Sequence, residues 1–289
     1  MTADLINLSQ KIRDPGMVET YRSVHACAEA LGIPYLIVGA SARDLVMHHA
    51  FGAAIKRATS DIDFAIQVAD WGAVEALRQT LAQNSFETTA VHHRLRSNNG
   101  IPIDIVPFGD IADAQAFIKM PPNEFQMNVR GFSEALTHAY NVSLSDSPAL
   151  IVKVASPEGM LLLKFIAWAD RERDKRGKDA ADIAYLLENL EELDPIAELM
   201  YGDQPLMEQY DHDLKLACAH HFGAKVFAMA EPESAEVLQS IFESRNEKLG
   251  MTVFLYDMNR HGDYRNSEQL LNAFIAGFNS TNETEESEK

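Results

Sequence analysis

Apolar residues recur at spacings of three and four between residues 17 and 31, which is the repeat of a helix with one buried face. Gly32 and Pro34 follow, and neither residue type continues a helix well. Residues 35–38 are then all apolar, and such a short run is typical of a buried strand. The start of the chain therefore predicts a helix that leads into the interior of a sheet.

Strand and helix patterns continue to alternate as far as residue 107. Ser41 and Asp70 stand at the start of two helical patterns and belong to the residue types that cap a helix N-terminus. The pair Asn99-Gly100 lies between two strand patterns and is a strong signal for a hairpin turn. These segments predict helices at 41–52 and 70–84 and strands at 62–68, 91–96 and 101–107.

The pattern changes near residue 147, beyond which helical spacing dominates apart from a strand at 151–154. The predicted fold class is α+β: an N-terminal lobe over 1–147, with a mixed sheet and flanking helices, and an all-helical lobe over 148–280. The tail, residues 281–289, is acidic and polar and predicts a disordered segment. The predicted helices of the second lobe are 157–170, 178–190, 194–201, 205–222, 232–248 and 266–278.

Composition narrows the class of protein. With 289 residues, 46% of them hydrophobic, the chain can bury a substantial core, and fibrous or disordered classes are excluded. Its net charge of −18 argues against broad binding to duplex DNA, because such binding depends on neutralising phosphates. The only cysteines, Cys27 and Cys218, provide neither a disulfide framework nor a zinc site. Without a membrane span or signal peptide, we expect a cytoplasmic protein with no membrane partner.

Three carboxylates stand out because of their positions. Asp61 and Asp63 are two residues apart at a predicted strand, so both project to one face and repel each other unless a cation lies between them. Asp104 is a lone acid within an apolar strand and needs a partner, either a metal ion or an arginine such as Arg94 or Arg96. If the two strands adjoin, the three acids form an oxygen-only set that suits Mg²⁺ or Mn²⁺.

A second feature lies about 20 residues before this pair. Gly39 follows a predicted strand and would let the backbone pass close to a ligand. The N–H groups of the next helix, together with the hydroxyl of Ser41, would receive a phosphate. Taken alone, this turn is equally a simple helix cap and the two acids a solvated strand end. In this order they are the layout needed to hold a nucleoside triphosphate with its metal ions.

Five segments of the chain together resemble one known family, the AbiEii-type nucleotidyltransferases of the DNA polymerase β-like superfamily. The first three are IVGASARDL, RATSDIDFAI and GIPIDIVPFGDI, and the later two are LKFIAW and RGKDAADIAYLL. The resemblance covers residues 33–190, and no motif is recognised in residues 195–289. One departure is Ala40, because many members read Gly-Gly or Gly-Ser where this chain has Gly39-Ala40-Ser41.

The resemblance implies an enzyme that moves NMP from an NTP to a hydroxyl group and releases pyrophosphate. Asp61 and Asp63 would bridge two metal ions, and Asp104 would complete one of them and accept the proton of the hydroxyl. Lys164 would place a point charge on the triphosphate. The residues implied in nucleotide binding are Gly39, Ser41, Arg43, Lys178, Asp179 and Asp182.

The segment around Lys164 has other interpretations. Asp179 and Asp182 lie on one face of a helix, where they would orient Lys164 or Arg176, contact the acceptor, or only favour the helix N-terminus. Lys164 itself would be an ordinary surface residue in the simplest reading. Residues 164–178 hold six basic and three acidic side chains, which would guide a phosphate-bearing acceptor or form a solvated linker.

Several acceptors fit these features. Many relatives implied by the resemblance are toxins, so a tRNA or other RNA 3′ end, or a protein, is the expected acceptor, and an antitoxin protein is an expected partner. A transferase for a small molecule such as an antibiotic is the alternative enzyme. A nucleotide-binding protein whose acids are structural is the alternative outside catalysis.

Overall fold

The structure is a computed structural model that describes residues 5–55, 60–121, 125–259 and 264–287. The chain divides into two compact units, Met1–Ser156 and Pro157–Lys289. The boundary predicted at 147/148 falls before β10 (Ala149–Val154), which pairs with strands of the first unit and therefore belongs to its sheet. None of the helices in the described part is long and apolar enough to cross a membrane.

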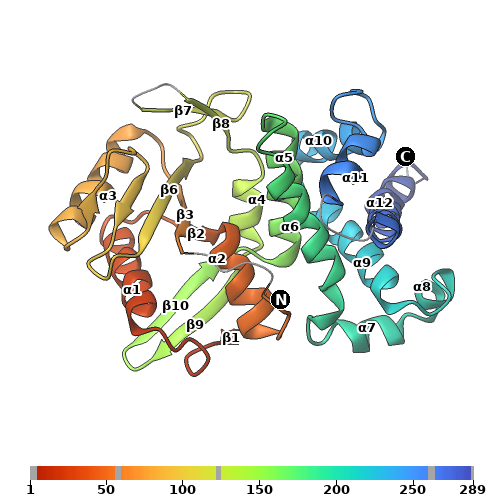
Figure 1. The fold of residues 1–289 in the computed structure, drawn as a ribbon, viewed down its shortest axis with the longest axis horizontal. Coiled ribbons are helices and arrows are strands. Elements are labelled where there is room, and N and C mark those ends of the chain that lie inside the picture. The colour runs from red at the N-terminus through yellow and green to blue at the C-terminus, as the bar shows by residue number, and fades with distance from the viewer. Residues whose placement is uncertain (1–4, 56–59, 122–124, 260–263, 288–289) are drawn as a thin grey trace. The chain divides into compact units, whose positions relative to one another are not determined.

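The first unit is built on an eight-stranded mixed sheet with the order β1-β9-β10-β2-β3-β6-β5-β4 (Figure 1). At its centre β2 (Tyr35–Val38) and β3 (Ile62–Gln67) are antiparallel, and β3 is parallel to β6 (Pro102–Phe108). The predicted hairpin is present, because β5 (Arg94–Arg96) is antiparallel to β6. The other strands are β1 (Ile6–Asn7), β4 (Glu87–Thr88), β9 (Tyr140–Asp146) and the separate pair β7 (Phe117–Met120) and β8 (Phe125–Asn128).

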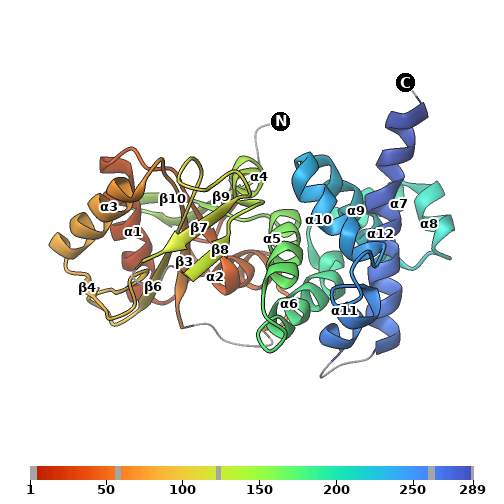
Figure 2. The same cartoon turned by 90° about the horizontal axis from the view of Figure 1, so that it is seen from above.

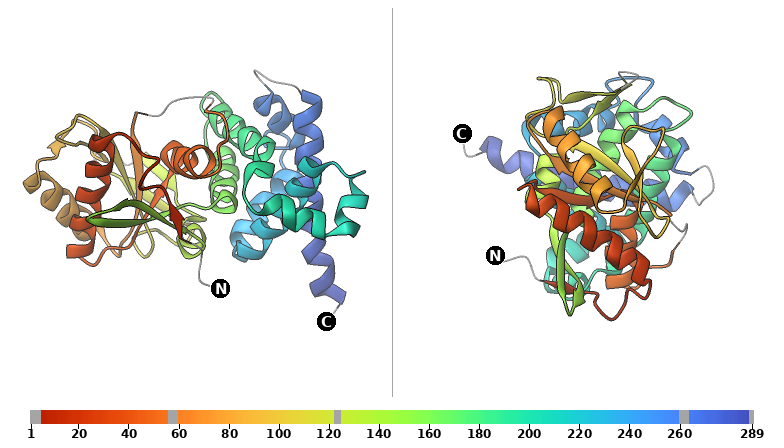
Figure 3. Two further views of the ribbon diagram at one scale, coloured as in Figure 1. Left: turned by 90° about the horizontal axis from the view of Figure 1, so that it is seen from below. Right: turned by 90° about the vertical axis from the view of Figure 1, so that its left-hand side faces the viewer.

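Two helices of the first unit lie side by side on one face of the sheet, α1 (Pro15–Ala30) and α3 (Trp71–Gln83), as Figures 1 and 3 show. Tyr21 of α1 meets Phe64 of β3 edge to face, with ring centroids 6.0 Å apart. Because side chains alternate along a strand, the residues on either side of Phe64 face away from α1. This packing decides which face of the sheet carries Asp63.

The helix predicted over 41–52 begins earlier and changes its geometry within its length. It comprises α2 (Gly39–Arg43) and a π-helical segment, Asp44–Ala50. The prediction that Ser41 begins the helix is wrong: Val38 is the N-cap, and the Ser41 hydroxyl donates to the Val38 carbonyl at 3.1 Å. Segments of π-helix are rare and concentrate at functional sites.

The helical unit departs from the predicted helices where residues adopt positive φ. The helix predicted over 205–222 is two helices, α8 (Gln204–Gln209) and α9 (Leu214–Met229), because Asp211 and His212 have φ of 52° and 62°. The last helix runs to Ser287 and includes residues 281–287 of the tail predicted as disordered, while 288–289 lie outside the described residues. The others are α5 (Pro157–Asp170), α6 (Gly177–Glu188), a 3₁₀ turn (Leu190–Glu192), α7 (Ile196–Gly202), α10 (Pro232–Phe242), α11 (Met251–Met258) and α12 (Tyr264–Ser287).

Helices α9 and α12 pack with their backbones in contact, and Figure 2 shows them side by side. A Cβ atom at Gly223 would overlap the carbonyl oxygen of Phe274, and one at Gly277 would overlap that of His220. Each helix thus supplies a glycine at the point where the other helix comes closest. Phe274 also stacks on Phe165 of α5 at 5.4 Å, which joins this pair to the core of the unit.

The two cysteines are free and buried, and each unit holds one of them. Cys27 lies in α1 with 4% of its surface exposed, and Cys218 lies in α9 with 0% exposed. Burial raises the pKa of Cys218 to about 12 and also raises the pKa of Cys27. Neither thiol is therefore an exposed nucleophile in the folded protein.

Candidate functional site

The carboxylates of two central strands share one face of the sheet. Asp63 of β3 and Asp104 of β6 are direct partners in the parallel pairing, so their side chains project to the same side. That side is the one away from α1, because Phe64 takes the side towards Tyr21. A register shift of one residue would have placed the two acids on opposite faces.

Arg94 joins two of the three predicted acids. It lies opposite Asp104 in the antiparallel pairing of β5 with β6. Its Nε donates to Oδ1 of Asp104 at 2.7 Å and its Nη2 to Oδ2 at 2.5 Å, while the same Nη2 donates to Oδ2 of Asp61 at 3.0 Å. These hydrogen bonds, those to Asp104 above all, raise the pKa of the Arg94 guanidinium further above its usual value.

The arrangement bears on the predicted metal site. No three His, Cys, Asp or Glu side chains in the described part of the chain form a ready group of metal ligands. The guanidinium nitrogen between Asp61 and Asp104 shows nevertheless that two carboxylates converge on one positive charge. Carboxylate oxygens are the ligands that Mg²⁺ and Mn²⁺ prefer, so the donor set fits such an ion once Arg94 has moved aside.

Gly39 is held against the acidic face. Its φ is +67°, and a Cβ atom at this position would overlap Oδ2 of Asp63. The sequence predicts that Gly39 allows the close approach of a ligand, whereas its close neighbour here is the chain's own carboxylate. Only glycine suits this position, because any other residue would be strained in the left-handed conformation and its side chain would overlap the Asp63 carboxylate.

The other predicted residues of the first phosphate-binding segment are engaged within the protein. Ser41 is 3% exposed and bonds the Val38 carbonyl, as described above. Arg43 is 7% exposed and forms an ion pair with Asp44 at 2.8 Å. In the segment RATSDIDFAI, residues 57–59 lie outside the described residues.

In the helical unit, Lys164 of α5 lies between two carboxylates of α6. Its Nζ is 3.0 Å from Oδ1 of Asp179 and 2.7 Å from Oδ2 of Asp182, and Arg171 reaches the other oxygen of Asp179 at 3.1 Å. Burial alone would lower the pKa of Lys164, but Asp182 and Asp179 outweigh it and the pKa is raised. Both acids are therefore directed at Lys164, and Lys178 lies beside them in the first turn of α6.

Arg176 has a different partner from those considered in the sequence. Its Nε donates to Oδ2 of Asp257 at 2.7 Å, and the same oxygen accepts a hydrogen bond from Trp168 Nε1 at 3.1 Å. Asp257 is 2% exposed and sits in the apolar helix α11. Like Asp104, Asp257 is a lone acid in an apolar segment, so the sequence carries the same signal at both positions.

Comparison with known proteins identifies one family. The chain matches the family described as "Nucleotidyl transferase AbiEii toxin, Type IV TA system" over residues 39–264. This range includes both groups of carboxylates and extends past the resemblance seen in residues 33–190. No curated protein matches the chain.

Two solved structures are similar to this chain at low identity. One is a complex of ANT(2″)-Ia with adenylyl-2″-tobramycin: identity is 15%, 77% of this chain and 97% of that chain are covered, and the TM-score is 0.35. The other is the CCA-adding enzyme of Thermotoga maritima complexed with tRNA: identity is 15%, 93% of this chain and 80% of that chain are covered, and the TM-score is 0.26. These similarities are too low to assign a substrate to this chain.

Proposed function

The chain belongs to the AbiEii nucleotidyltransferase family, and on that premise we propose that its reaction is a metal-dependent transfer of NMP from an NTP to a hydroxyl group. The single observation that supports the metal site best is the pairing of Asp63 with Asp104, next to Asp61 and on one sheet face. Carboxylates so close together need a cation, and Arg94 supplies one in the structure. We propose that Mg²⁺ or Mn²⁺ takes this place when an NTP is bound.

Each residue then has a distinct task. Metal ions at the three acids would make the attacking hydroxyl more acidic and stabilise the departing pyrophosphate. Asp104 would accept the hydroxyl proton, which requires that Arg94 has first left both of its oxygens. Gly39 keeps the Asp63 carboxylate in place by leaving it room. Lys164, oriented by Asp179 and Asp182, would contribute positive charge to nucleotide binding.

The proposed acceptor is an RNA 3′ end, such as that of a tRNA, or a protein, and the proposed role is that of the toxin in a toxin–antitoxin pair. The description of the family supports the toxin role and the existence of an antitoxin partner. Arrest of growth on induced expression of the wild-type chain, but not of Asp63→Asn, would be the cellular counterpart of transfer.

Transfer is tested directly by incubating the purified protein with each α-³²P-labelled NTP, Mg²⁺ or Mn²⁺, total RNA and cell lysate. We expect label in the RNA or the protein fraction, released pyrophosphate, and loss of both in EDTA. Asp61→Asn and Asp63→Asn should lower transfer at least 100-fold, since each removes a metal-bridging charge. Asp194→Asn is the matched control, because Asp194 is exposed and lies outside all five segments of the resemblance.

Three outcomes would contradict the proposal in different ways. Full activity of Asp63→Asn would contradict the proposed metal site. Label only in a small-molecule fraction would replace the proposed acceptor with the antibiotic-type alternative. Nucleotide binding in calorimetry without any pyrophosphate release would indicate a binding protein whose acids are structural.

A further inference from the structure

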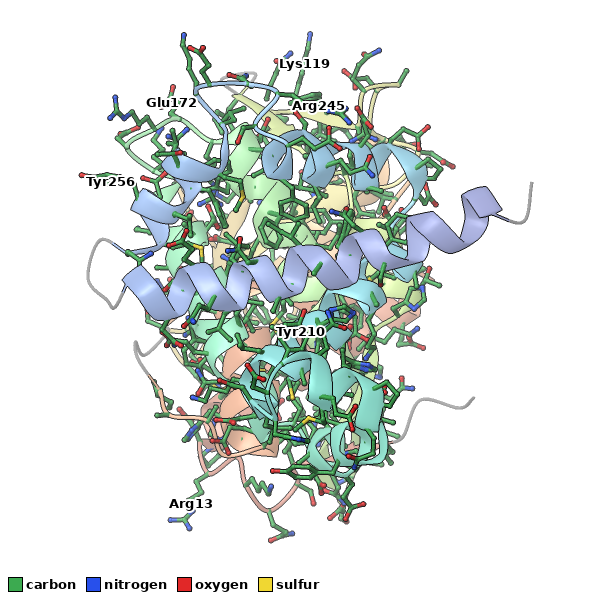
Figure 4. The ribbon with its side chains drawn as sticks, turned by 90° about the vertical axis from the view of Figure 1, so that its right-hand side faces the viewer. Arg13, Lys119, Glu172, Tyr210, Arg245 and Tyr256 are labelled. Carbon is green, nitrogen blue, oxygen red and sulfur yellow. The ribbon has the colours of Figure 1, made fainter. Side chains whose placement is uncertain are left out.

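The helical unit contains a cavity of about 640 Å³ far along the chain from the carboxylates of β3 and β6. Its walls come from two loops, the one between α5 and α6 and the one between α10 and α11, together with the start of α11. Figure 4 shows Glu172 and Arg245, one residue from each loop, at the same end of the unit. The lining residues are Arg173, Arg176, Asn246, Glu247, Lys248, Leu249 and Val253.

Arg176 is the fixed part of this cavity. Its side chain is 6% exposed, and its Nε is held by Asp257 at 2.7 Å. Its Nη1 donates to the carbonyl of Lys248 at 3.1 Å, and its guanidinium lies 4.9 Å from the ring centroid of Trp168. Among the described residues Nη2 of Arg176 has no hydrogen-bond partner. This nitrogen is not fully buried. The guanidinium is thus held in place with donors left over at the cavity.

The charge around the cavity is opposite to that of the rest of the unit. Residues 171–178, which form the first loop and the start of α6, and residues 245–248 of the second loop hold seven Lys and Arg residues against three Asp and Glu residues. The remainder of Pro157–Lys289 holds 6 basic and 24 acidic residues. An anion is therefore repelled by most of this unit and attracted to one end of it.

We propose that this cavity binds the phosphate group of a nucleotide, either a free nucleotide or one unit of an RNA strand. A planar guanidinium with spare donors matches phosphate oxygens, and Arg173 and Lys248 would add mobile charges from the two loops. Pockets of about 300–1,000 Å³ hold ligands of this size. Leu249 and Val253 provide an apolar wall for the base or ribose. The site is additional to the proposed transfer site and does not depend on it.

The test measures binding in EDTA, so that no divalent ion can load the carboxylates of the first unit. Pyrophosphate, AMP and a short single-stranded RNA are titrated into the full chain by calorimetry. The Trp71→Phe variant leaves Trp168 as the only tryptophan, and its fluorescence reports whether the ligand is bound beside Arg176. We expect at least one of the three probes to bind and to change this fluorescence.

Variants of exposed residues separate this site from general electrostatics. Arg173→Ala and Lys248→Ala should each weaken binding about fivefold to tenfold at low salt, with a smaller effect at high salt. Arg245→Ala is the matched control, because Arg245 is in the same loop but pairs with Glu236 and Glu243 and does not line the cavity. It should change the affinity less than twofold. Asp63→Asn should bind as the wild type does.

Binding of RNA but not of AMP would identify the strand as the ligand, and the reverse would identify the free nucleotide; both support the site. Failure of all three probes to bind would overturn it. Equal losses in Lys248→Ala and Arg245→Ala would also overturn it, since they would show attraction by overall charge alone. Neither failure affects the proposed transfer reaction, which is measured with metal ions at the other unit.

Discussion

At the scale of single residues, the guanidinium of Arg94 supplies the positive charge that a bound metal ion would otherwise supply to the carboxylates. It neutralises Asp61 and Asp104 through one shared nitrogen. Removing one partner of such a group leaves the others unpaired, and their mutual repulsion then opposes folding. Arg94 and a divalent ion are thus competitors for the same oxygens.

Arg94→Ala is therefore expected to lower the melting temperature in EDTA and to restore it when Mn²⁺ is added. The loss is about 1 kcal/mol at low salt, because the Arg94 side chain is 36% exposed and solvent screens the pair. The apparent affinity for Mn²⁺, measured by calorimetry, should rise. Arg96→Ala is the control, since Arg96 bonds the Gly100 carbonyl and neither acid. Equal behaviour of the two variants would show that Arg94 does not compete with the ion.

Gly39→Ala should destabilise the chain in two separable ways. The left-handed conformation costs about 1–2 kcal/mol, and the displaced Asp63 carboxylate adds about 1–3 kcal/mol of overpacking. Gly32→Ala carries only the first cost, because Gly32 has φ +63° and no atom within 4 Å of the added carbon. Chemical denaturation of both variants measures the difference. Equal losses of unfolding free energy in the two variants would mean that only the backbone angle of Gly39, and not its contact with Asp63, requires glycine.

At the scale of the elements, the prediction succeeded where an apolar pattern coincides with a single continuous strand or helix. The strand at residues 35–38 was predicted because all four residues are apolar; it is β2, and all four residues are buried. By contrast, β9 has a polar residue, Ser143, among its three buried positions and was missed. The helix predicted over 205–222 failed because its apolar spacing continues across Asp211 and His212, whose backbone turns. Periodicity records which residues are buried, and not whether the backbone between them is continuous.

The candidate site shows the same limit. Strand alternation predicts which residues of one strand share a face, but the position of Asp104 on the same face as Asp63 also depends on the register of β6 against β3. Arg94 and Arg96 lie on the same face of β5, so alternation could not choose between them as the partner of Asp104. Only the register decides, because Arg94 lies opposite Asp104 and Arg96 lies opposite Pro102. Register depends on the whole hairpin and is not visible in any single residue.

The contact between α9 and α12 reverses a general rule for helices. Ala in place of Gly in a helix ordinarily stabilises by about 1 kcal/mol. Gly223→Ala should instead destabilise by about 2 kcal/mol or more, because its methyl group would overlap the Phe274 carbonyl and separate the two helices. Gly202→Ala in α7, with no atom within 4 Å of the added carbon, should be neutral or stabilising. Thermal unfolding of the two variants tests this, and a stable Gly223→Ala would contradict the close packing.

At the scale of the whole molecule, acidification should destabilise the fold partly through histidines of the helical unit. Burial lowers the pKa of both His220 and His221 below the ordinary value of 6.5. The unfolded chain then binds more protons than the folded one, so their contribution is complete above pH 6.5 and decreases as the pH falls below it. Denaturant midpoints between pH 7.5 and 5 should fall less steeply in His221→Gln than in the wild type. Identical slopes would show that His221 does not contribute.

Because each unit buries one cysteine, the chain contains an internal probe of local unfolding in each unit. Iodoacetamide reacts with a thiolate, and a buried thiol with a raised pKa reacts only while its surroundings are open. Mass spectrometry of the two peptides would therefore time Cys27 and Cys218 separately in one unmodified sample. Equal rates would reveal a molecule that opens all at once. A faster alkylation rate at either thiol would identify the unit that unfolds more readily. Adding NTP with Mn²⁺ should lower the alkylation rate of the cysteine in the unit that binds it.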